Sequence, residues 1–490
     1  MAVLVTAIHA FVAASKAWML ATSASMTAGE AGTDAAPAAG LLWWAMPASA
    51  LLTADDRDPT PAELLAARPH LAMHAMDGLL LGGVPLAAVA DALGTPAWVY
   101  SADLMRARLG ALSAALAAAA VPARVHYAVK ANDHLAVLRV FARAGAGADV
   151  VSAGELRRAR AAGIAPADIV FSGVGKTGEE LREALSEGIA QVNVESAEEL
   201  DRLSAAAAAT GRTARVALRV NPDVDAGTHA KISTGRADDK FGIAFADAAA
   251  LYARAALLPG LRPVGLAMHI GSQVTRLAPY RAAYARLAEL VRALRAAGEA
   301  VETVDCGGGL GIGYRNEPVP GPDALAAVIA GALRGLDARV IVEPGRWLVG
   351  PAGVLLAEVV LVKRAGAQRF VVLDAAMNDL VRPAMYEAFH GIVPVAAADA
   401  ARPPAPAEVV GPVCESGDTF ARGRALPGLT PGSRVAILDV GAYGAVMSST
   451  YNARPLAAIA MIDAGRWAVI RPRQPIEALW REERVPEWLT

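Results

Sequence analysis

Cysteine is nearly absent from this sequence. Only Cys306 and Cys414 occur in 490 residues, so a disulfide framework is excluded and a reducing compartment, the cytoplasm, is the expected location. No CxxC pair or histidine cluster has metal-ligand spacing, and no metal site is predicted. An excess of charge of one sign is also lacking, because 46 basic residues face 48 acidic ones. That balance gives no reason to expect a nucleic acid or a membrane surface as a partner.

Long uncharged hydrophobic runs are missing as well. Residues 1–28 are apolar, but Lys16 interrupts them and no basic region precedes them, so they make a poor signal peptide and a poor membrane span. Residues 29–60 are rich in Ala, Thr, Asp and Pro, a composition typical of a flexible segment. We therefore interpret residues 1–74 as a flexible N-terminal extension.

What the sequence does contain is a regular alternation that begins near residue 101. Short apolar, β-branched runs are separated by segments of Ala, Leu, Arg and Glu with helical spacing. Eight of these runs are expected to form strands, at 124–130, 147–152, 169–173, 191–196, 214–220, 263–270, 303–309 and 339–345. Eight strands alternating with helices predict a closed (β/α)8 barrel over residues 101–348. An open doubly wound sheet is the competing arrangement, and the number of strands does not decide between the two.

The pattern changes after about residue 350. Strand-like runs are now joined by turns and Pro-rich linkers instead of regular helices, and residues 396–408 are expected to form a loop. This composition predicts a second domain over residues 349–490, a β-sandwich or β-barrel. One more strand-like run, 94–101, precedes the first barrel strand, and we assign residues 75–100 to strands that join the β domain. The chain would then start in one domain, pass through the barrel and return.

Reactive side chains fall at the C-terminal ends of the predicted barrel strands, where barrels of this kind hold their active sites. Lys130 ends the first strand and His269 nearly ends the sixth. A GGGLG run at 307–311 follows the seventh strand, and EPGR at 343–346 follows the eighth. Alone, such a lysine is usually solvated, such a histidine usually belongs to the core, and such a glycine run is usually a turn. Together at one barrel mouth, a lysine, a glycine cradle for a phosphate and an acid indicate pyridoxal 5'-phosphate (PLP), whose covalent attachment removes the cost of burying a lone ammonium.

Longer motifs run in order from about residue 76 to the C-terminus. They are YAVKAN, ADVVSAGEL, FSGVGKT, NVES, RVNPDVDAGTHAKISTG, KFGI, MHIGSQ, GGGLGI, EPGR, MNDLVRPAMY, GPVCESGD and GAYG. With these motifs the sequence resembles the fold-type III PLP-dependent decarboxylases and, among them, the diaminopimelate decarboxylases. The resemblance implies PLP as cofactor, a PLP barrel with a C-terminal β domain, and decarboxylation of meso-2,6-diaminopimelate to L-lysine and carbon dioxide, the last step of lysine biosynthesis.

The resemblance also implies a set of coenzyme-binding residues. Lys130 corresponds to the lysine that binds PLP covalently, His269 to the residue that stacks on its ring, and Glu343 to the partner of the pyridine nitrogen. The matched phosphate and further coenzyme ligands are Ser272, Gly307, Gly308, Gly309, Gly345, Arg346 and Tyr443. A carboxylate at 343 keeps the pyridine nitrogen protonated, so that the ring can absorb electrons when carbon dioxide leaves. The similar alanine racemases place an arginine there, and Glu343 therefore favours decarboxylation over racemisation.

The residues implied for the substrate are mostly charged. Arg346 and Arg382 match the groups that bind its distal carboxylate, for which the planar guanidinium is well suited. Tyr386 and Tyr443 match hydroxyl partners, and Glu415 is expected to accept the distal ammonium. For each arginine, the competing interpretation is an ordinary surface ion pair.

The two cysteines receive different interpretations. Cys414, in CESGD, matches the acid that returns a proton to the α-carbon, with a buried structural thiol as the alternative. Cys306 lies inside a predicted strand and is expected to belong to the core. In the family that the sequence resembles, the cysteine-bearing loop reaches the active site of a partner subunit. This implies a homodimer with both active sites at the interface.

Two other functions remain open at this point. One is a sibling PLP decarboxylase that acts on arginine, D-ornithine or carboxynorspermidine, substrates that would not require this set of arginines. The other is a non-catalytic PLP carrier built on the same barrel. Such carriers have one domain and lack the segments CESGD and GAYG, which are present here.

Overall fold

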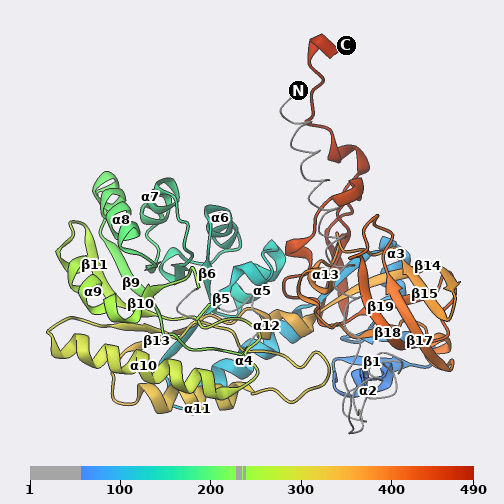
Figure 1. Cartoon of the computed structure of the whole chain (residues 1–490), viewed down its shortest axis with the longest axis horizontal. Helices are drawn as coiled ribbons and strands as arrows, with labels where there is room; N and C mark the ends of the chain where they lie inside the picture. The colour runs from blue at the N-terminus through green and yellow to red at the C-terminus, as the bar shows by residue number, and fades with distance from the viewer. Residues whose placement is uncertain (1–56, 228–233, 236–238, 490) are drawn as a thin grey trace, which may run out of the picture. The chain divides into compact units, whose positions relative to one another are not determined.

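Eight parallel strands close into a barrel in the computed structural model, which describes residues 57–227, 234–235 and 239–489 (Figure 1). The barrel strands are β5 (Ala123–Ala128), β6 (Gly147–Val150), β7 (Ile169–Phe171), β8 (Gln191–Val194), β9 (Ala214–Asn221), β11 (Leu261–Ala267), β12 (Thr303–Asp305) and β13 (Arg339–Val342). β8 pairs with β7 and β9, and β13 pairs with β12 and β5, so the ring is complete. The short strand β10 (Ile243–Ala244) adds to β9 outside the ring. The predicted (β/α)8 barrel is confirmed, and the open sheet is excluded.

Helices connect the barrel strands. They are α4 (Ala102–Ala118), α5 (Leu135–Arg143), α6 (Ala153–Ala161), α7 (Gly178–Glu187), α8 (Ala197–Thr210), α9 (Ala248–Leu257), α10 (Leu277–Ala296) and α11 (Pro322–Leu333). Four of them begin directly after a hydroxyl side chain that accepts a backbone N–H of the first turn, at Ser101, Ser152, Thr177 and Ser196. α7 and α8 end on Gly188 and Gly211, both in the left-handed conformation. Short-range chemistry of the chain thus sets where these strands stop and helices start.

The second body of the molecule is a β domain built around a long strand. Its strands are β4 (Ala97–Ser101), β14 (Gly353–Ala365), β15 (Gln368–Leu373), β16 (Ile392–Pro394), β17 (Pro404–Val410), β18 (Thr419–Pro427), β19 (Arg434–Ile437), β20 (Ala458–Asp463) and β21 (Arg466–Arg471). The first half of β14 pairs with β4 and β19, and its second half pairs with β15. β4 also pairs with β20, so the chain enters the barrel from this sheet and returns to it afterwards (Figure 1).

The β domain differs from the expected pattern between residues 396 and 408. The predicted loop 396–408 contains the helix α14 (Ala397–Ala400) and the start of β17, and we therefore correct that interpretation. β17 forms because it lies between β15 and β18, and this long-range pairing outweighs its Pro-rich composition. The other helices of this part are α12 (Arg346–Val349) and α13 (Arg382–Tyr386).

Ordered elements also occur within the described end of the predicted extension 1–74. They are α2 (Pro61–Ala66), which begins with a capping box of Thr60 and Glu63, and β1 (Leu71–His74), which pairs with β2 (Gly78–Leu81). β3 (Val84–Pro85) and α3 (Leu86–Leu93) follow. Between α2 and β1, the buried Arg68 forms an ion pair with the buried Asp439 of the β domain. Residues 1–56 lie outside the described part of the chain.

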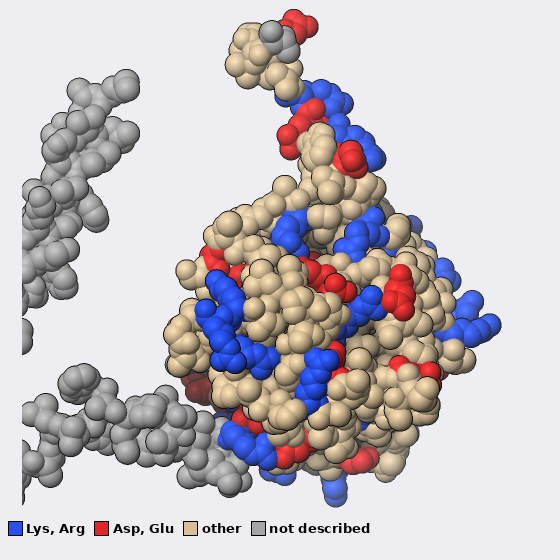
Figure 2. Space-filling model, turned by 90° about the vertical axis from the view of Figure 1, so that its right-hand side faces the viewer, with Lys and Arg blue, Asp and Glu red and all other residues tan. Residues whose placement is uncertain are grey.

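Charge is mixed on the surface of the β-domain side. Figure 2 shows basic and acidic side chains interspersed over the face that it presents. Among the described residues, no helix combines the length and the apolar character needed to cross a bilayer. In the same part of the chain, no cluster of His, Cys, Asp and Glu is arranged to hold a metal ion.

Candidate functional site

A cavity of about 500 Å³ opens where the C-terminal ends of the barrel strands meet the β domain. Seven of the residues singled out in the sequence line it: Lys130, His269, Ser272, Arg346, Arg382, Tyr386 and Tyr443. The first four come from the barrel region and the last three from the β domain. The tertiary structure thus brings together residues that are up to 313 positions apart in sequence (443 minus 130).

Lys130 lies on a short turn that is hydrogen-bonded to the β domain. β5 ends at Ala128, and residues Val129–Ala131 form a single 3₁₀ turn. The backbone N–H of Tyr443 donates to the Ala131 carbonyl at 2.8 Å, and Asn132 Nδ2 donates to the Gly441 carbonyl at 3.1 Å. The lysine therefore stands on a turn whose position depends on both domains.

The amine of Lys130 is an ammonium paired with a buried carboxylate. Its Nζ donates to Asp149 Oδ2, at the end of β6, and the Lys130 side chain is about one third exposed. Burial alone would lower the pKa of Lys130, but the negative charge of Asp149 outweighs it and raises the pKa above its ordinary value. Asp149 is fully buried, and its Oδ1 has no hydrogen-bond partner among the described residues.

Glu343 lies behind Lys130, directly after β13, and it is buried with Asp305 at the end of β12. The side-chain amide of Asn193 reaches both carboxyl groups, at 3.1 Å and 3.5 Å. Burial raises the pKa of Glu343 well above its ordinary value, and the negative charges of Asp149 and Asp305 add to this effect. We call Asp149, Asp305 and Glu343 the carboxyl cluster. At this end of the cavity, three carboxyl groups lie near a single ammonium, that of Lys130.

His269 is a neutral imidazole in this site. Burial, together with the positive charges of Arg219 and Lys130, holds its pKa well below the ordinary value. Its Nδ1 accepts the backbone N–H of Gly308 at 3.2 Å, which leaves the ring proton on Nε2. A neutral ring fixed in this way can lie flat against an aromatic coenzyme without adding charge.

The opposite end of the cavity contains two buried arginines, which we call the arginine pair. Arg346 donates to Tyr314 Oη at 2.7 Å and to Ser272 Oγ at 3.0 Å, and its guanidinium lies 4.8 Å from the centre of the Tyr443 ring. Arg382 Nη1 donates to His390 Nε2 at 2.7 Å. This direction follows because burial holds the pKa of His390 well below the ordinary value and its Nδ1 donates to the Leu438 carbonyl.

Neither member of the arginine pair has a carboxylate partner within the described part of the chain, although each is only 5% exposed. Their described partners are hydroxyl groups, an imidazole and aromatic faces. Burial and the charge of Arg346 lower the pKa of Arg382. Two buried cations without a counterion form a strong binding site for an anion.

The glycines at 307–309 prove to have a packing role. A Cβ at Gly307 would lie 2.2 Å from the Met268 carbonyl oxygen, and one at Gly308 would lie 2.0 Å from the Glu343 carbonyl oxygen. Gly309 has φ +99 and packs equally closely on Gly271. The N–H of Gly307 donates to Asp305 Oδ1 and that of Gly308 to His269 Nδ1. Two of the three predicted phosphate donors therefore have partners within the chain itself.

Gly345 also allows close packing that a larger residue would prevent. A Cβ there would lie 3.0 Å from the Ala131 Cβ and 3.2 Å from the Ala128 Cβ. The glycine therefore lets the segment after β13 pack directly against the turn that carries Lys130.

Cys414 and Glu415 are not brought to this cavity. Both are exposed and neither lines it. Their loop is stabilised by the buried Asp418, whose carboxylate accepts the N–H groups of Met377 and Val413. Cys306, by contrast, is buried in the core at the end of β12, as expected.

Sequence reasoning missed several residues of the site. Asp149 lies inside the predicted strand 147–152, where a charged residue in an apolar run is a signal that could have identified it. Asp305 gives the same signal inside the predicted strand 303–309, two residues before the glycine run. Tyr314 and His390 lie in segments without a strand or helix pattern, and no sequence signal indicates that they contact the arginine pair.

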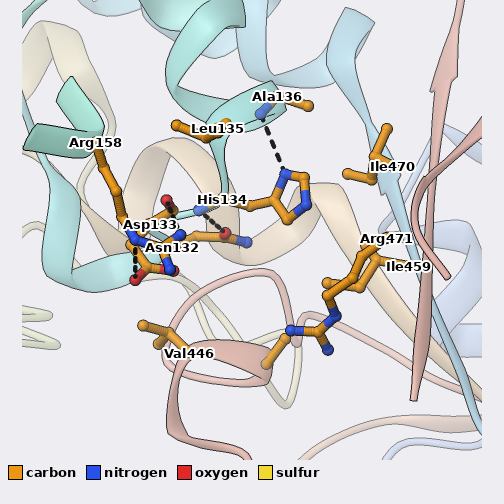
Figure 3. A pocket seen from close by; sticks show the side chains of 11 residues that line it. Asn132, Asp133, His134, Leu135, Ala136, Arg158, Val446, Ile459, Ile470 and Arg471 are labelled. Atoms are coloured by element: carbon orange, nitrogen blue, oxygen red, sulfur yellow. Dashed lines mark hydrogen bonds and ion pairs between the residues drawn. The ribbon is translucent and has the colours of Figure 1, made fainter. Parts of the chain in front are cut away.

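A second cavity of about 410 Å³ lies next to the Lys130 turn and is lined in part by Asn132 (Figure 3). Arg158 pairs with Asp133, and His134 Nδ1 accepts the N–H of Ala136. Arg471 also lines the cavity, and its guanidinium donates to the Ala457 carbonyl. Asn132 Oδ1 accepts the N–H of His134, so this wall supports the turn. We interpret the cavity as packing space beside the site.

Comparisons with known proteins agree with this geometry. A family model described as "Pyridoxal-dependent decarboxylase, pyridoxal binding domain" matches residues 104–350. The diaminopimelate decarboxylase of Zymomonas mobilis is 49% identical over 415 residues, which cover 84% of this chain and 98% of that protein.

Solved structures show the same relationship. The diaminopimelate decarboxylase from Helicobacter pylori complexed with L-lysine superposes with a TM-score of 0.78 at 39% identity, covering 81% of this chain and 99% of that chain. The enzyme from M. jannaschii in co-complex with L-lysine gives a TM-score of 0.82 at 34% identity, covering 86% and 100%.

The barrel, the β domain and the cavity between them define a fold-type III PLP-dependent decarboxylase, a carbon–carbon lyase. Its cofactor is PLP. Within this class, the chain belongs to the diaminopimelate decarboxylase family.

Of the motif at 219–235, residues 228–233 lie outside the described part of the chain.

Proposed function

We propose that this protein decarboxylates meso-2,6-diaminopimelate to L-lysine and carbon dioxide, the last step of lysine biosynthesis. The observation that carries the proposal is the arginine pair, two buried guanidiniums that have no carboxylate partner among the described residues and that lie in the cavity that Lys130 also lines. Diaminopimelate has a second carboxylate far from the carbon that reacts, and this group would supply the missing negative charge. Arginine, D-ornithine and other substrates without a distal carboxylate would leave two buried cations unpaired.

The residues present fit PLP. The carboxyl cluster has more acid groups than the single ammonium of Lys130 can balance, and a buried oxygen of Asp149 lacks a partner among the described residues. A protonated ring nitrogen would reduce this imbalance. In the proposed assignment Lys130 binds the coenzyme covalently, the neutral His269 lies against its ring, and Glu343 faces its nitrogen. Ser272, Gly307, Gly308, Gly309, Gly345, Arg346 and Tyr443 are the proposed phosphate and neighbouring ligands.

When bound, PLP supplies the electron-withdrawing ring that takes up the electron pair of the broken carbon–carbon bond. The chain supplies orientation and charge. Arg382, with Arg346 and the hydroxyl groups of Tyr386 and Tyr443, would hold the distal end of the substrate, which fixes the reacting carbon near Lys130.

We further propose that a second copy of the chain completes the site. Cys414, the proposed proton donor, and Glu415, the proposed partner of the distal ammonium, are exposed and lie outside the cavity of their own chain. A homodimer would bring them to the partner's cavity. We place the reaction in the cytoplasm, where two free cysteines and an amine-reactive coenzyme are compatible.

The substrate assignment is tested by carbon dioxide release from meso-diaminopimelate with and without added PLP. Arginine, D-ornithine and carboxynorspermidine serve as the comparison panel. The proposal expects PLP-dependent release with kcat/KM highest for diaminopimelate. A higher kcat/KM for any member of the panel would overturn it.

The dimer is tested by complementation. Lys130→Ala and Cys414→Ala are inactive separately in the proposed arrangement, but mixed and re-equilibrated subunits regain activity, because some dimers carry one intact site. If the mixture stays inactive while light scattering shows that mixed dimers form, Cys414 does not serve the partner's cavity.

A further inference from the structure

Asp305 and Glu343 form a buried acid pair under the Lys130 end of the cavity. Asn193 Nδ2 reaches both carboxyl groups, at 3.1 Å from Asp305 Oδ2 and 3.5 Å from Glu343 Oε1, and the two residues are 1% and 7% exposed. Two adjacent buried carboxylates repel each other, and one proton shared between them relieves this repulsion. The pair therefore holds one proton and one negative charge.

The surrounding donors decide which residue carries the charge. The Gly307 N–H donates to Asp305 Oδ1 at 2.9 Å, and Asn193 Nδ2 donates to Asp305 Oδ2 at 3.1 Å. The distance from Asn193 Nδ2 to Glu343 Oε1 is longer, 3.5 Å. Donors stabilise the ionised form of the group that they reach. Asp305 is therefore the carboxylate and Glu343 the acid.

Asn193 is itself fixed in the orientation that this assignment needs. Gln191 Nε2 donates to Asn193 Oδ1 at 2.8 Å, and Gln191 Oε1 accepts from Thr303 Oγ1 at 3.1 Å. Because Asn193 Oδ1 is occupied as an acceptor, its Nδ2 must face the acid pair. Its other described contact from Nδ2 is Ser172 Oγ, at 3.1 Å.

Other ionisable groups that face Glu343 leave the assignment unchanged. Asp149, from the end of β6, also faces it, but Asp149 is paired with the ammonium of Lys130. Cys306, next to Asp305, has its pKa raised well above the ordinary value by burial, so its thiol stays neutral. The acid pair is thus the place where a single buried proton is shared.

We propose that Asp305, oriented by Asn193, is a positioning residue that holds the proton of this pair on the Glu343 oxygen. The inference rests on the proposed function, because Glu343 is proposed to face the ring nitrogen of PLP. Glu343 can then give up its O–H proton to form an N–H bond on that nitrogen and become a carboxylate. The two carboxylates that result both stabilise the protonated nitrogen.

The test counts the neutral carboxyl group in the full-length chain without coenzyme by infrared spectroscopy. The pH is set about one unit above 7, because the pKa values of Glu155 and Asp379 are raised to about 7 and about 6 and these acids are then ionised. We expect one neutral carboxyl band that Glu343→Gln removes. Asp305→Asn also removes it, because an amide at 305 donates to Glu343 and favours its ionised form. Addition of PLP removes the band from the unsubstituted chain.

A band that survives Glu343→Gln, or that keeps its full intensity in Asp305→Asn, overturns the proposal. Asp399→Asn, at a buried carboxyl group of the β domain, is the matched control and leaves the band unchanged. In the loaded enzyme, Asp305→Asn is expected to lower kcat about tenfold and to change KM less than about twofold, since the loss affects ring protonation and not substrate binding.

If Asp305→Asn does not fold, Asn193→Ala replaces it. Without its amide donor, Asp305 is ionised less readily. When the pH is lowered, the infrared band of neutral Asp305 should therefore appear with a midpoint about one pH unit higher than in the unsubstituted chain. An unchanged midpoint overturns the proposal. Failure of the proposed function would be seen separately, as absent turnover of diaminopimelate by the unsubstituted protein, whereas the infrared band needs no substrate.

Discussion

The two ends of the catalytic cavity carry opposite, unbalanced charges. At one end the carboxyl cluster of Asp149, Asp305 and Glu343 faces the ammonium of Lys130. At the other end the arginine pair, Arg346 and Arg382, is buried without a described carboxylate. Buried charges in a folded protein are normally paired with opposite charges. An end of the cavity whose charges lack such partners is therefore expected to bind a ligand of opposite charge. The cavity is therefore expected to bind a positively charged group at the barrel end and a negatively charged group at the arginine end.

The two ends also differ in how they are supported. The carboxyl cluster stands on adjacent strands of a closed barrel and is fixed by backbone amides and by Asn193. The arginine pair is supported across the domain boundary, by Tyr314 from the barrel region and His390 from the β domain. Substitutions at the barrel end should therefore change the chemical step, and those at the arginine end should change substrate affinity.

The largest effect is expected from Lys130→Ala. Removing the amine abolishes covalent attachment of PLP and should lower kcat by roughly 10³-fold or more. Borohydride reduction followed by mass spectrometry of the 130 peptide checks the attachment. Lys363→Ala, in the exposed part of β14, is the control and should keep both the adduct and the activity. An adduct of unchanged yield in Lys130→Ala would show that another amine is the attachment point.

Arg382→Leu should act at the opposite end. It removes one charged partner of the distal carboxylate, so KM for diaminopimelate should rise roughly 10- to 100-fold while kcat changes little. Inhibition by L-lysine, which keeps that carboxylate, should weaken in parallel. Steady-state kinetics measure both, with the surface variant Arg402→Leu as control. If kcat falls and KM does not change, Arg382 serves the reacting centre and the contrast between the two ends is wrong.

Tyr314→Phe sharpens the same comparison with a smaller change. The phenylalanine ring keeps its packing against Arg382, but the hydroxyl that accepts from Arg346 is lost. A neutral acceptor contributes about 1 kcal/mol, so KM should rise only about fivefold. Tyr252→Phe is a matched control, because its hydroxyl bonds the Ala300 carbonyl elsewhere in the barrel. Equal KM values in the two variants would remove Tyr314 from the arginine end.

The smallest effect concerns stability and pH. Burial raises the pKa of Asp379 from 3.8 to about 6, so the folded chain binds a proton more tightly than the unfolded chain. Stability is then greatest below pH 3.8 as far as this group is concerned, and it falls as the pH rises to about 6, by about 1–3 kcal/mol. Asp379→Asn should flatten this decline in urea unfolding curves. A decline of the same size in the variant would assign it to other acids.

Much of the barrel could be predicted because its signals are local. Each of the eight predicted strands overlaps an observed one, and the hydroxyl caps at Ser152, Thr177 and Ser196 mark where helices start. The β domain was harder. β16, β18 and β20 were not predicted as strands, and the predicted loop 396–408 holds α14 and the start of β17. Their pairing partners are distant in sequence, and pairing of this kind outweighs local composition.

By itself, the sequence determined the alternation that forms the barrel, the strand-end position of Lys130 and the motifs that match the decarboxylase family. These follow from side-chain periodicity and local backbone preference, which the chain carries at every position. Only the tertiary structure decided that Asp305 and Glu343 lie buried beside the same Asn193 amide and that Tyr314 and His390 support the arginine pair. Charge matching depends on distance and burial, and both exist only after segments from two domains have packed around one cavity.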